Sequence, residues 1–219
     1  MLRFASCFAA LAVLPACSGG IDRSAFNLDV CQSSAQWDPL AGISPADPDA
    51  FVELAEIDDQ AKSAQVLSTH GASCTSAPDP TACRAAIASV TSNSGWSTPI
   101  CGGGGCRTSL QFFVTEKAGV VSVIDDDASL AALLAPIDVA ADAVLVAAYA
   151  DPIAYPPAAV DCTEPQALER ADGSFDVFLA TGDGTCTDRV EQDVAVFPNG
   201  TTALLDETTS KATQTCLSP

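Results

Sequence analysis

The spacing of hydrophobic residues changes near the middle of the chain, and this change predicts helices before it and strands after it. Asp47-Pro48 opens a segment in which apolar residues from Phe51 to Leu67 recur every three or four positions, and His70-Gly71 closes it. A second pair, Asp79-Pro80, opens a similar but shorter segment. Because Asp at an N-cap followed by Pro is typical of a helix start, we expect two helices that form an N-terminal helical hairpin.

From Thr108 onwards, apolar residues alternate with polar ones, which is typical of strands with one buried face. The pattern predicts strands over residues 110–114 and 120–124 and a short helix over 128–135. Residues 143–149 are apolar throughout, and this run predicts a strand that is buried on both faces.

The last third of the chain predicts a meander of strands. We expect these strands at residues 167–171, 175–181, 189–197 and 201–206. Asp172-Gly173 and Asn199-Gly200 are expected to form two-residue hairpin turns, in which both central positions need positive φ. Helices early and strands late predict an α+β domain with a mostly antiparallel sheet and an N-terminal helical hairpin.

The first 16 residues have the composition of a secretory signal peptide. Arg3 precedes an 11-residue apolar stretch at 4–14, which has the length of a signal h-region and is shorter than the roughly 20 residues that span a bilayer as a helix. Ala16 is the small residue expected before a cleavage site. We therefore expect the segment to direct export, and ordinary secretion after cleavage near Ala16 is one outcome.

The sequence Leu14-Pro15-Ala16-Cys17 at this junction resembles the lipobox of uncharacterised lipoproteins of Gram-negative bacteria, and the resemblance is confined to the first 18 residues. It implies cleavage before Cys17, a diacylglycerol on the Cys17 thiol and acylation of the new amine, for example with palmitate. Two or three acyl chains bind a membrane stably. Ser18 after the cysteine, in place of Asp, implies the outer membrane, with the protein facing the periplasm or the exterior.

The chain is expected to have three parts, and its net charge excludes nucleic acids as partners. We expect a signal peptide over 1–16, a lipid-anchored tether over 17–45 and a single α+β disulfide-linked domain over 46–219. Without the first 16 residues, 8 Lys and Arg face 28 Asp and Glu, a net charge of −20. This charge excludes binding to the phosphate backbone of nucleic acids. The membrane is therefore the one partner that the sequence predicts by class, and any protein or ligand partner is left unidentified.

Cysteine count predicts a disulfide framework. Ten cysteines, less Cys7 in the signal peptide and the lipidated Cys17, leave an even number for an oxidising compartment. The eight are Cys31, Cys74, Cys83, Cys101, Cys106, Cys162, Cys186 and Cys216. By proximity along the chain, we predict the pairs Cys74 with Cys83, Cys101 with Cys106, Cys162 with Cys186, and Cys31 with Cys216.

Candidate catalytic chemistry is sparse. His70 is the only histidine, and at a predicted helix end it is better explained as a polar or cationic C-terminal residue than as a catalytic base. The four glycines between Cys101 and Cys106 suit a tight loop closed by a disulfide, because glycine tolerates dihedral angles that other residues avoid. Alternatively, this bare backbone contacts a ligand or partner, with Trp96 close by.

Two acidic segments suggest a calcium site but fit structural roles better. Asp125 to Asp127 and Asp183 offer hard oxygen ligands, yet neither segment has the spacing of an EF-hand loop. Asp127 as an N-cap and Asp183 as a turn residue explain both segments. The sequence predicts no metal and no cofactor.

Two functional hypotheses follow. The first is a lipoprotein anchored in the outer membrane, with a non-catalytic domain that binds an envelope partner or a ligand or has a structural role. The alternative is a secreted or lipid-anchored hydrolase that uses carboxylates. Two convergent carboxylates in a concave pocket, at least one with a raised pKa, would favour the hydrolase.

Overall fold

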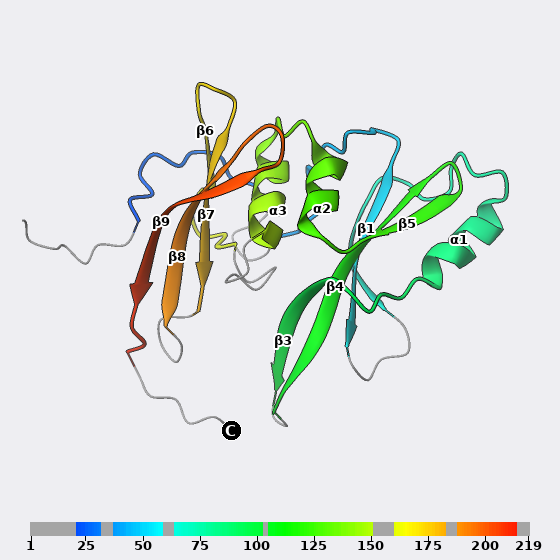
Figure 1. Cartoon of the computed structure of the whole chain (residues 1–219), viewed down its shortest axis with the longest axis horizontal. Helices are drawn as coiled ribbons and strands as arrows, with labels where there is room; N and C mark the ends of the chain where they lie inside the picture. Colours follow the sequence, from blue (N-terminus) through cyan, green and yellow to red (C-terminus); the bar gives the residue numbers. More distant parts are fainter. Residues whose placement is uncertain are drawn as a thin grey trace, which may run out of the picture.

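The computed structural model has two antiparallel sheets at opposite ends, with two helices between them (Figure 1). The structure describes residues 21–31, 37–58, 64–102, 105–150, 160–182 and 188–213. The first sheet has the order β2-β1-β4-β3, with β5 also paired to β4, and consists of β1 (Phe51–Asp58), β2 (Gln65–His70), β3 (Trp96–Gly102), β4 (Gly105–Lys117) and β5 (Val120–Ile124). The second has the order β6-β7-β8-β9 and consists of β6 (Ala167–Glu169), β7 (Phe175–Thr181), β8 (Arg189–Val196) and β9 (Thr202–Ser210). The helices are α1 (Pro80–Ala88), α2 (Asp127–Leu134) and α3 (Ala140–Ala150).

One continuous hydrophobic core joins the two sheets through α2 and α3. α3 is covered on all sides, because every residue from Asp142 to Tyr149 is buried. The same core includes Leu54 and Phe113 of the first sheet and Val177 of the second. α1 packs on the opposite face of the first sheet, in a separate cluster. The predicted α+β class, with mostly antiparallel sheet and disulfide bonds, is therefore confirmed.

The first half of the predicted helical hairpin is wrong. Within this segment, residues 51–58 form β1 and residues 65–70 form β2, an antiparallel pair in which Val52 lies opposite His70. β1 has buried apolar residues on both faces, with Val52 and Leu54 in the core around α3 and Ala55 in the cluster around α1. A strand covered on both faces does not alternate between apolar and polar residues, so its pattern can match a helical spacing.

The second predicted helix is correct and is α1. The Asp79 carboxylate accepts hydrogen bonds from the backbone N–H groups of Thr81 and Ala82, each at 3.0 Å, and Pro80 occupies the first turn. The Asp-Pro signal therefore identified a helix start here. The same signal at Asp47-Pro48 did not, because a β-strand follows it.

The predicted strand over 143–149 is also wrong, since these residues form most of α3. An apolar run has the same appearance in a buried strand and in a helix buried on all sides, so periodicity alone does not separate them. The run is rich in alanine, which has the highest helix propensity. Local propensity and complete burial together account for the helix.

The two predicted hairpin turns are present, but their backbone differs from the expected one. Gly173 and Gly200 have φ of 80° and 79°, whereas Asp172 and Asn199 are not among the residues with positive φ. At the first turn, the Gly173 N–H donates to the carbonyl of Arg170 at 3.0 Å. This arrangement is typical of a type I turn followed by a left-handed glycine.

Much of the predicted tether belongs to the folded domain. Within 17–45, the structure describes 21–31 and 37–45, and Phe26, Trp37, Leu40 and Ile43 are buried there. Trp37, Leu40 and Ile43 join the core around α3. Among the helices of the described ranges, none has the length and apolar character needed to cross a membrane.

Asp142 is a fully buried carboxyl group at the start of α3. Its Oδ1 accepts a hydrogen bond from the backbone N–H of Ser44 at 2.9 Å, whereas its Oδ2 is buried with no partner among the described residues. Burial is the main reason that the pKa of Asp142 is raised to about 6, and the nearby charge of Asp138 adds to this rise. The ionised form is therefore disfavoured in the folded state.

We predict that the Asp142→Asn variant becomes more stable relative to the wild-type protein as pH rises. The folded-state pKa lies above the unfolded value, so the wild-type protein loses stability as pH increases from about 4 through 6, whereas the neutral amide does not. Between pH 4 and pH 7.5, the variant should gain about 2 to 3 kcal/mol in free energy of unfolding relative to wild type, measured by urea denaturation. Asp49→Asn, at an exposed position, is the control and should show no such trend. A pH-independent difference between Asp142→Asn and wild type would contradict the prediction.

Candidate functional site

A cavity of about 270 Å³ lies between the first sheet and α1. We call it the α1 groove. Its lining is mainly apolar and comes from β1, β2, β4, α1 and the residues just after α1, including Phe51, Ala55, Val66, Ile87, Val90 and Val114. Val66 is 52% exposed, so apolar surface at this edge is open to solvent. The groove is somewhat smaller than the usual range for drug-sized ligands, and it can hold a small molecule or one side chain of a partner.

Two opposite charges lie in the lining of the α1 groove without being paired. Glu53 projects from β1 and is half-buried, and burial raises its pKa above the ordinary value. Arg84 projects from α1 and is exposed. Neither side chain has an ion pair or hydrogen bond with any other residue that the structure describes. A half-buried carboxylate without a partner is costly, and a bound cationic group would offset this cost.

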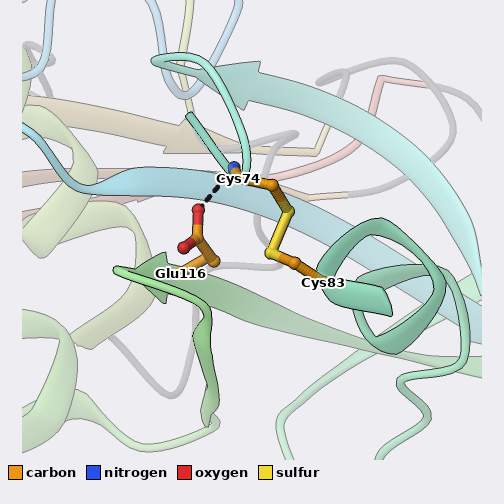
Figure 2. Close-up of side chains that lie close together, drawn as sticks. All are labelled: Cys74, Cys83 and Glu116. Carbon is orange, nitrogen blue, oxygen red and sulfur yellow. Dashed lines mark hydrogen bonds between the residues drawn. A yellow bond between two sulfur atoms is a disulfide. The ribbon is translucent and has the colours of Figure 1, made fainter. Parts of the chain in front are cut away.

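A disulfide and a buried carboxylate hold the segment before α1 against the helix and β4 (Figure 2). Cys74 is bonded to Cys83 of α1, which ties the helix to the segment after β2. Glu116 of β4 accepts hydrogen bonds from the backbone N–H groups of Cys74 and Gly119, each at 2.6 Å. Cys74 has φ of 61°, a left-handed conformation that non-glycine residues rarely adopt, so these contacts hold a strained backbone in place.

The same three residues are the one group in the described chain whose ligand atoms are close enough to hold a metal ion. Sγ of Cys74 and Sγ of Cys83 are joined in the disulfide, so neither is a thiolate. Both oxygens of Glu116 accept backbone hydrogen bonds. In the oxidised protein this group is therefore structural.

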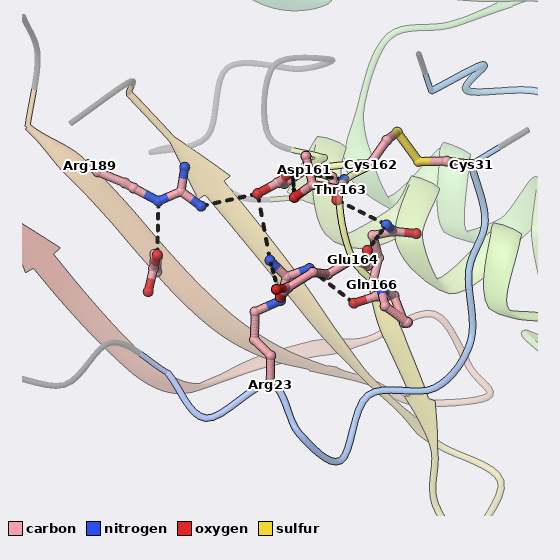
Figure 3. A network of polar contacts seen from close by, with 10 residues as sticks. Arg23, Cys31, Asp161, Cys162, Thr163, Glu164, Gln166 and Arg189 are labelled. Carbon is pink, nitrogen blue, oxygen red and sulfur yellow. Dashed lines mark hydrogen bonds and ion pairs between the residues drawn. A yellow bond between two sulfur atoms is a disulfide. The ribbon is translucent and has the colours of Figure 1, made fainter. Parts of the chain in front are cut away.

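A second polar network binds the N-terminal segment to the second sheet (Figure 3). Arg23 forms ion pairs with Asp161 at 3.6 Å and Glu164 at 3.2 Å, and its guanidinium lies 4.0 Å from the ring centre of Phe178 on β7. Arg189 of β8 also pairs with Asp161, at 3.2 Å. We call residues 21–31 the N-terminal strap.

Backbone bonds and a disulfide complete the attachment of the strap. The N–H of Leu28 donates to the carbonyl of Ala167 on β6 at 2.9 Å, and the N–H of Val30 donates to Oε1 of Gln166 at 3.0 Å. Phe26 packs on Phe178 in an edge-to-face contact. Cys31 is bonded to Cys162, 131 residues away. The strap is therefore held along its whole length.

Disulfide pairing agrees with the sequence at one predicted pair and contradicts it at two. Cys74 pairs with Cys83 as predicted. Cys31 pairs with Cys162, so the predicted pairs of Cys31 with Cys216 and of Cys162 with Cys186 are wrong. Proximity along the chain fails here because the strap and the segment before β6 meet only in the fold. Cys17, Cys186 and Cys216 lie outside the described residues. The backbone register places Cys101 opposite Cys106 on β3 and β4, and whether these two form the predicted bond stays a prediction.

The residues singled out for chemistry from the sequence have structural positions. His70 ends β2 and is not at a helix end, which corrects the prediction for this residue. Trp96 packs edge to face on Phe113 and Tyr149, and its indole N–H donates to Asp127 at 2.9 Å. The side chain of Trp96 is therefore partly buried and packs against the core around α3.

The acidic segment before α2 is bound by neighbouring residues. Asp126, and not Asp127 as predicted, is the N-cap of α2, and its carboxylate accepts a hydrogen bond from the Ser129 N–H at 2.9 Å. Asp125 accepts a hydrogen bond from Ser94. Asp183, the other candidate for calcium, lies outside the described residues.

Sequence reasoning missed a buried polar chain beside α3. The Tyr149 hydroxyl donates to Oε1 of Gln111 at 2.8 Å, and Oε1 of Glu56 accepts hydrogen bonds from Ser109 and Gln111. Burial, and secondarily the charge of Glu56, raise the pKa of Tyr149, so it stays protonated. Glu56, Ser109 and Gln111 alternate with apolar residues along β1 and β4, which was the available signal for a shared face.

Comparisons of the chain with protein-family models, with curated proteins and with solved structures find no match.

We predict that Glu116→Gln destabilises the protein by weakening the contact between β4 and the segment before α1. The amide has one oxygen, so one of the two backbone N–H groups that Glu116 now satisfies would face an NH₂ group and lose its partner. The expected loss is about 2 kcal/mol in free energy of unfolding, measured by urea denaturation. Glu169→Gln, at an exposed position on β6, is the matched control and should change the stability little. Equal stability of the two variants would count against a structural role for Glu116.

Proposed function

We propose that this protein is a lipoprotein of the outer membrane, anchored through Cys17, whose folded domain is a non-catalytic binding module. The lipobox-like sequence at Cys17 supports the anchor. The α1 groove supports the binding role, because it combines an apolar floor with the unpaired charges of Glu53 and Arg84. The presence of exposed apolar surface next to charged side chains without partners is the observation that carries the proposal.

The lining of the α1 groove specifies the ligand class. Glu53 is suited to an ammonium or guanidinium group, Arg84 at the rim is suited to a carboxylate, and the apolar floor is suited to an aliphatic side chain. A free amino acid with an aliphatic side chain carries all three features, and the N-terminal residue of a peptide carries the ammonium group and the side chain. The module would therefore bind a small zwitterion or a peptide segment of an envelope partner.

The carboxylate arrangement favours binding over the alternative of a carboxylate-based hydrolase. Among the described residues that line the α1 groove, Glu53 is the one acid. A larger cavity of about 500 Å³ near α2 is lined by Asp47 and Glu116, but Asp47 is paired with Lys117 and Glu116 is held by backbone N–H groups. Neither cavity offers the two free, convergent carboxylates that glycoside hydrolysis requires.

We predict that membrane attachment depends on Cys17. In a Gram-negative host, the wild-type protein should be recovered in the membrane fraction with an intact mass that shows acyl chains on a chain starting at Cys17. Cys17→Ser should lack this mass and move to the soluble fraction, because the domain has no other lipid anchor in this proposal. Cys7→Ser, within the segment that is removed, is the matched control and should behave as wild type. An unacylated wild-type chain, or membrane attachment of Cys17→Ser, would refute the lipid anchor.

We predict that L-leucine binds in the α1 groove and that its ammonium group contributes through Glu53. Titration of the ¹⁵N-labelled protein with L-leucine should shift the amide signals of Val66 and Ile87, and N-acetyl-leucine, which lacks the charged amine, should bind about tenfold more weakly. In Glu53→Gln the two ligands should bind alike. Glu169→Gln is the control and should keep the tenfold preference. If neither ligand shifts Val66 or Ile87 at millimolar concentration, this ligand class is excluded.

A further inference from the structure

The N-terminal strap determines where the chain leaves the folded domain. Ile21 packs against the cluster of Phe26, Phe178 and Ala180 on the outer face of the second sheet. That face is turned away from α2 and α3, and the first part of the strap, from Ile21 to Phe26, lies on it (Figure 1). Beyond Phe26, the strap crosses the β6 edge and packs against the core around α3. Because Arg23 and Cys31 fix the strap further along, the exit point cannot move relative to β7 without breaking these contacts.

The distance from this exit point to the proposed lipid is short. Cys17 and Ile21 are four residues apart, which corresponds to about 14 Å when the chain is fully extended. This length is roughly half the thickness of the hydrocarbon core of a bilayer, about 30 Å. A lipid on Cys17 therefore has no long tether that would let the domain turn freely.

We propose that the outer face of the second sheet, with the strap on it, is the membrane-proximal surface of the anchored protein, and that the α1 groove points away from the bilayer. This inference rests on the proposed function, because it requires lipid on Cys17. The strap and α1 lie at opposite ends of the long axis of the molecule (Figure 1). The anchor would thus expose the α1 groove to ligands or partners in the surrounding compartment.

Connection through the lipid, and not charge attraction, would hold this surface at the bilayer. Arg23 and Arg189 are already paired with Asp161, Glu164 and Glu191, so they offer little free positive charge to lipid headgroups. The mature chain also carries a net charge of −20. Only the short link to the lipid on Cys17 therefore keeps this surface close to the membrane. A chain without lipid should show no affinity for phosphatidylcholine membranes.

Paramagnetic relaxation in nanodiscs tests the orientation. The acylated full-length mature protein, purified from membranes, is placed in phosphatidylcholine nanodiscs that contain a lipid with a nitroxide on its headgroup. The relaxation enhancement at the methyl groups of Ile21 and Leu168 should be at least fivefold larger than at Ile87 and Val66 in the α1 groove. In a variant with 20 Gly and Ser residues inserted before Ile21, the added reach of roughly 25 Å should remove this difference.

The outcomes separate the orientation from the lipid anchor. Intact mass of the sample is measured first, and an unacylated chain would overturn both the proposed anchor and the orientation. An acylated chain with equal enhancement at the two ends, or with larger enhancement at Ile87 and Val66, would overturn the orientation alone. Persistence of the fivefold difference in the insertion variant would also overturn it, because the short connection would then not be its cause.

Discussion

The fold depends on the burial of one helix between two sheets. α3 has no face that reaches solvent from Asp142 to Tyr149, so both sheets are positioned by packing against it. Large apolar side chains contribute roughly 1.5 to 3 kcal/mol each when they are fully buried. Among the described residues, most of the buried large apolar side chains belong to the core that contains α3. Removal of α3 would leave the inner faces of both sheets open to water.

Two buried polar side chains of α3 help to fix its orientation, and one of them also lowers the stability of the fold. At its C-terminal end, Tyr149 is hydrogen-bonded to Gln111 and lies 5.0 Å, between ring centres, from both Trp96 and Phe113. At its N-terminal end, Asp142 binds the Ser44 backbone but leaves one oxygen without a partner. The hydrogen bond to Gln111 satisfies the Tyr149 hydroxyl, whereas the unpartnered oxygen of Asp142 lowers the stability of the fold when Asp142 is ionised. The helix is thus fixed in register at both ends.

The two surfaces with proposed roles lie at the ends of the molecule because the core occupies its centre. The α1 groove forms on the face of the first sheet that α3 does not cover, and the Cys74–Cys83 disulfide holds α1 there. The first part of the strap, from Ile21 to Phe26, covers the corresponding outer face of the second sheet. Each outer face is thus covered by a short segment that a disulfide ties down, and this arrangement separates the proposed anchor from the proposed binding site.

Features that depend on neighbours within a few residues were predictable from the sequence. These include the Asp79-Pro80 helix start, the glycine turns at Gly173 and Gly200, and the short-range Cys74–Cys83 bond. The strands of the second sheet were also found, because the turn signals Asp172-Gly173 and Asn199-Gly200 separate them in the sequence. In each case the determining contact is local or repeats along the chain.

The sequence by itself determined these local elements and the expectation of an exported chain, and tertiary structure decided the rest. Residues 51–58 and 143–149 have ambiguous apolar patterns, and each segment became strand or helix according to what covered it on both sides. The Cys31–Cys162 bond and the meeting of Glu53 with Arg84 in one groove also required the complete fold. Contacts between distant segments depend on how the elements pack, and no local propensity encodes that packing.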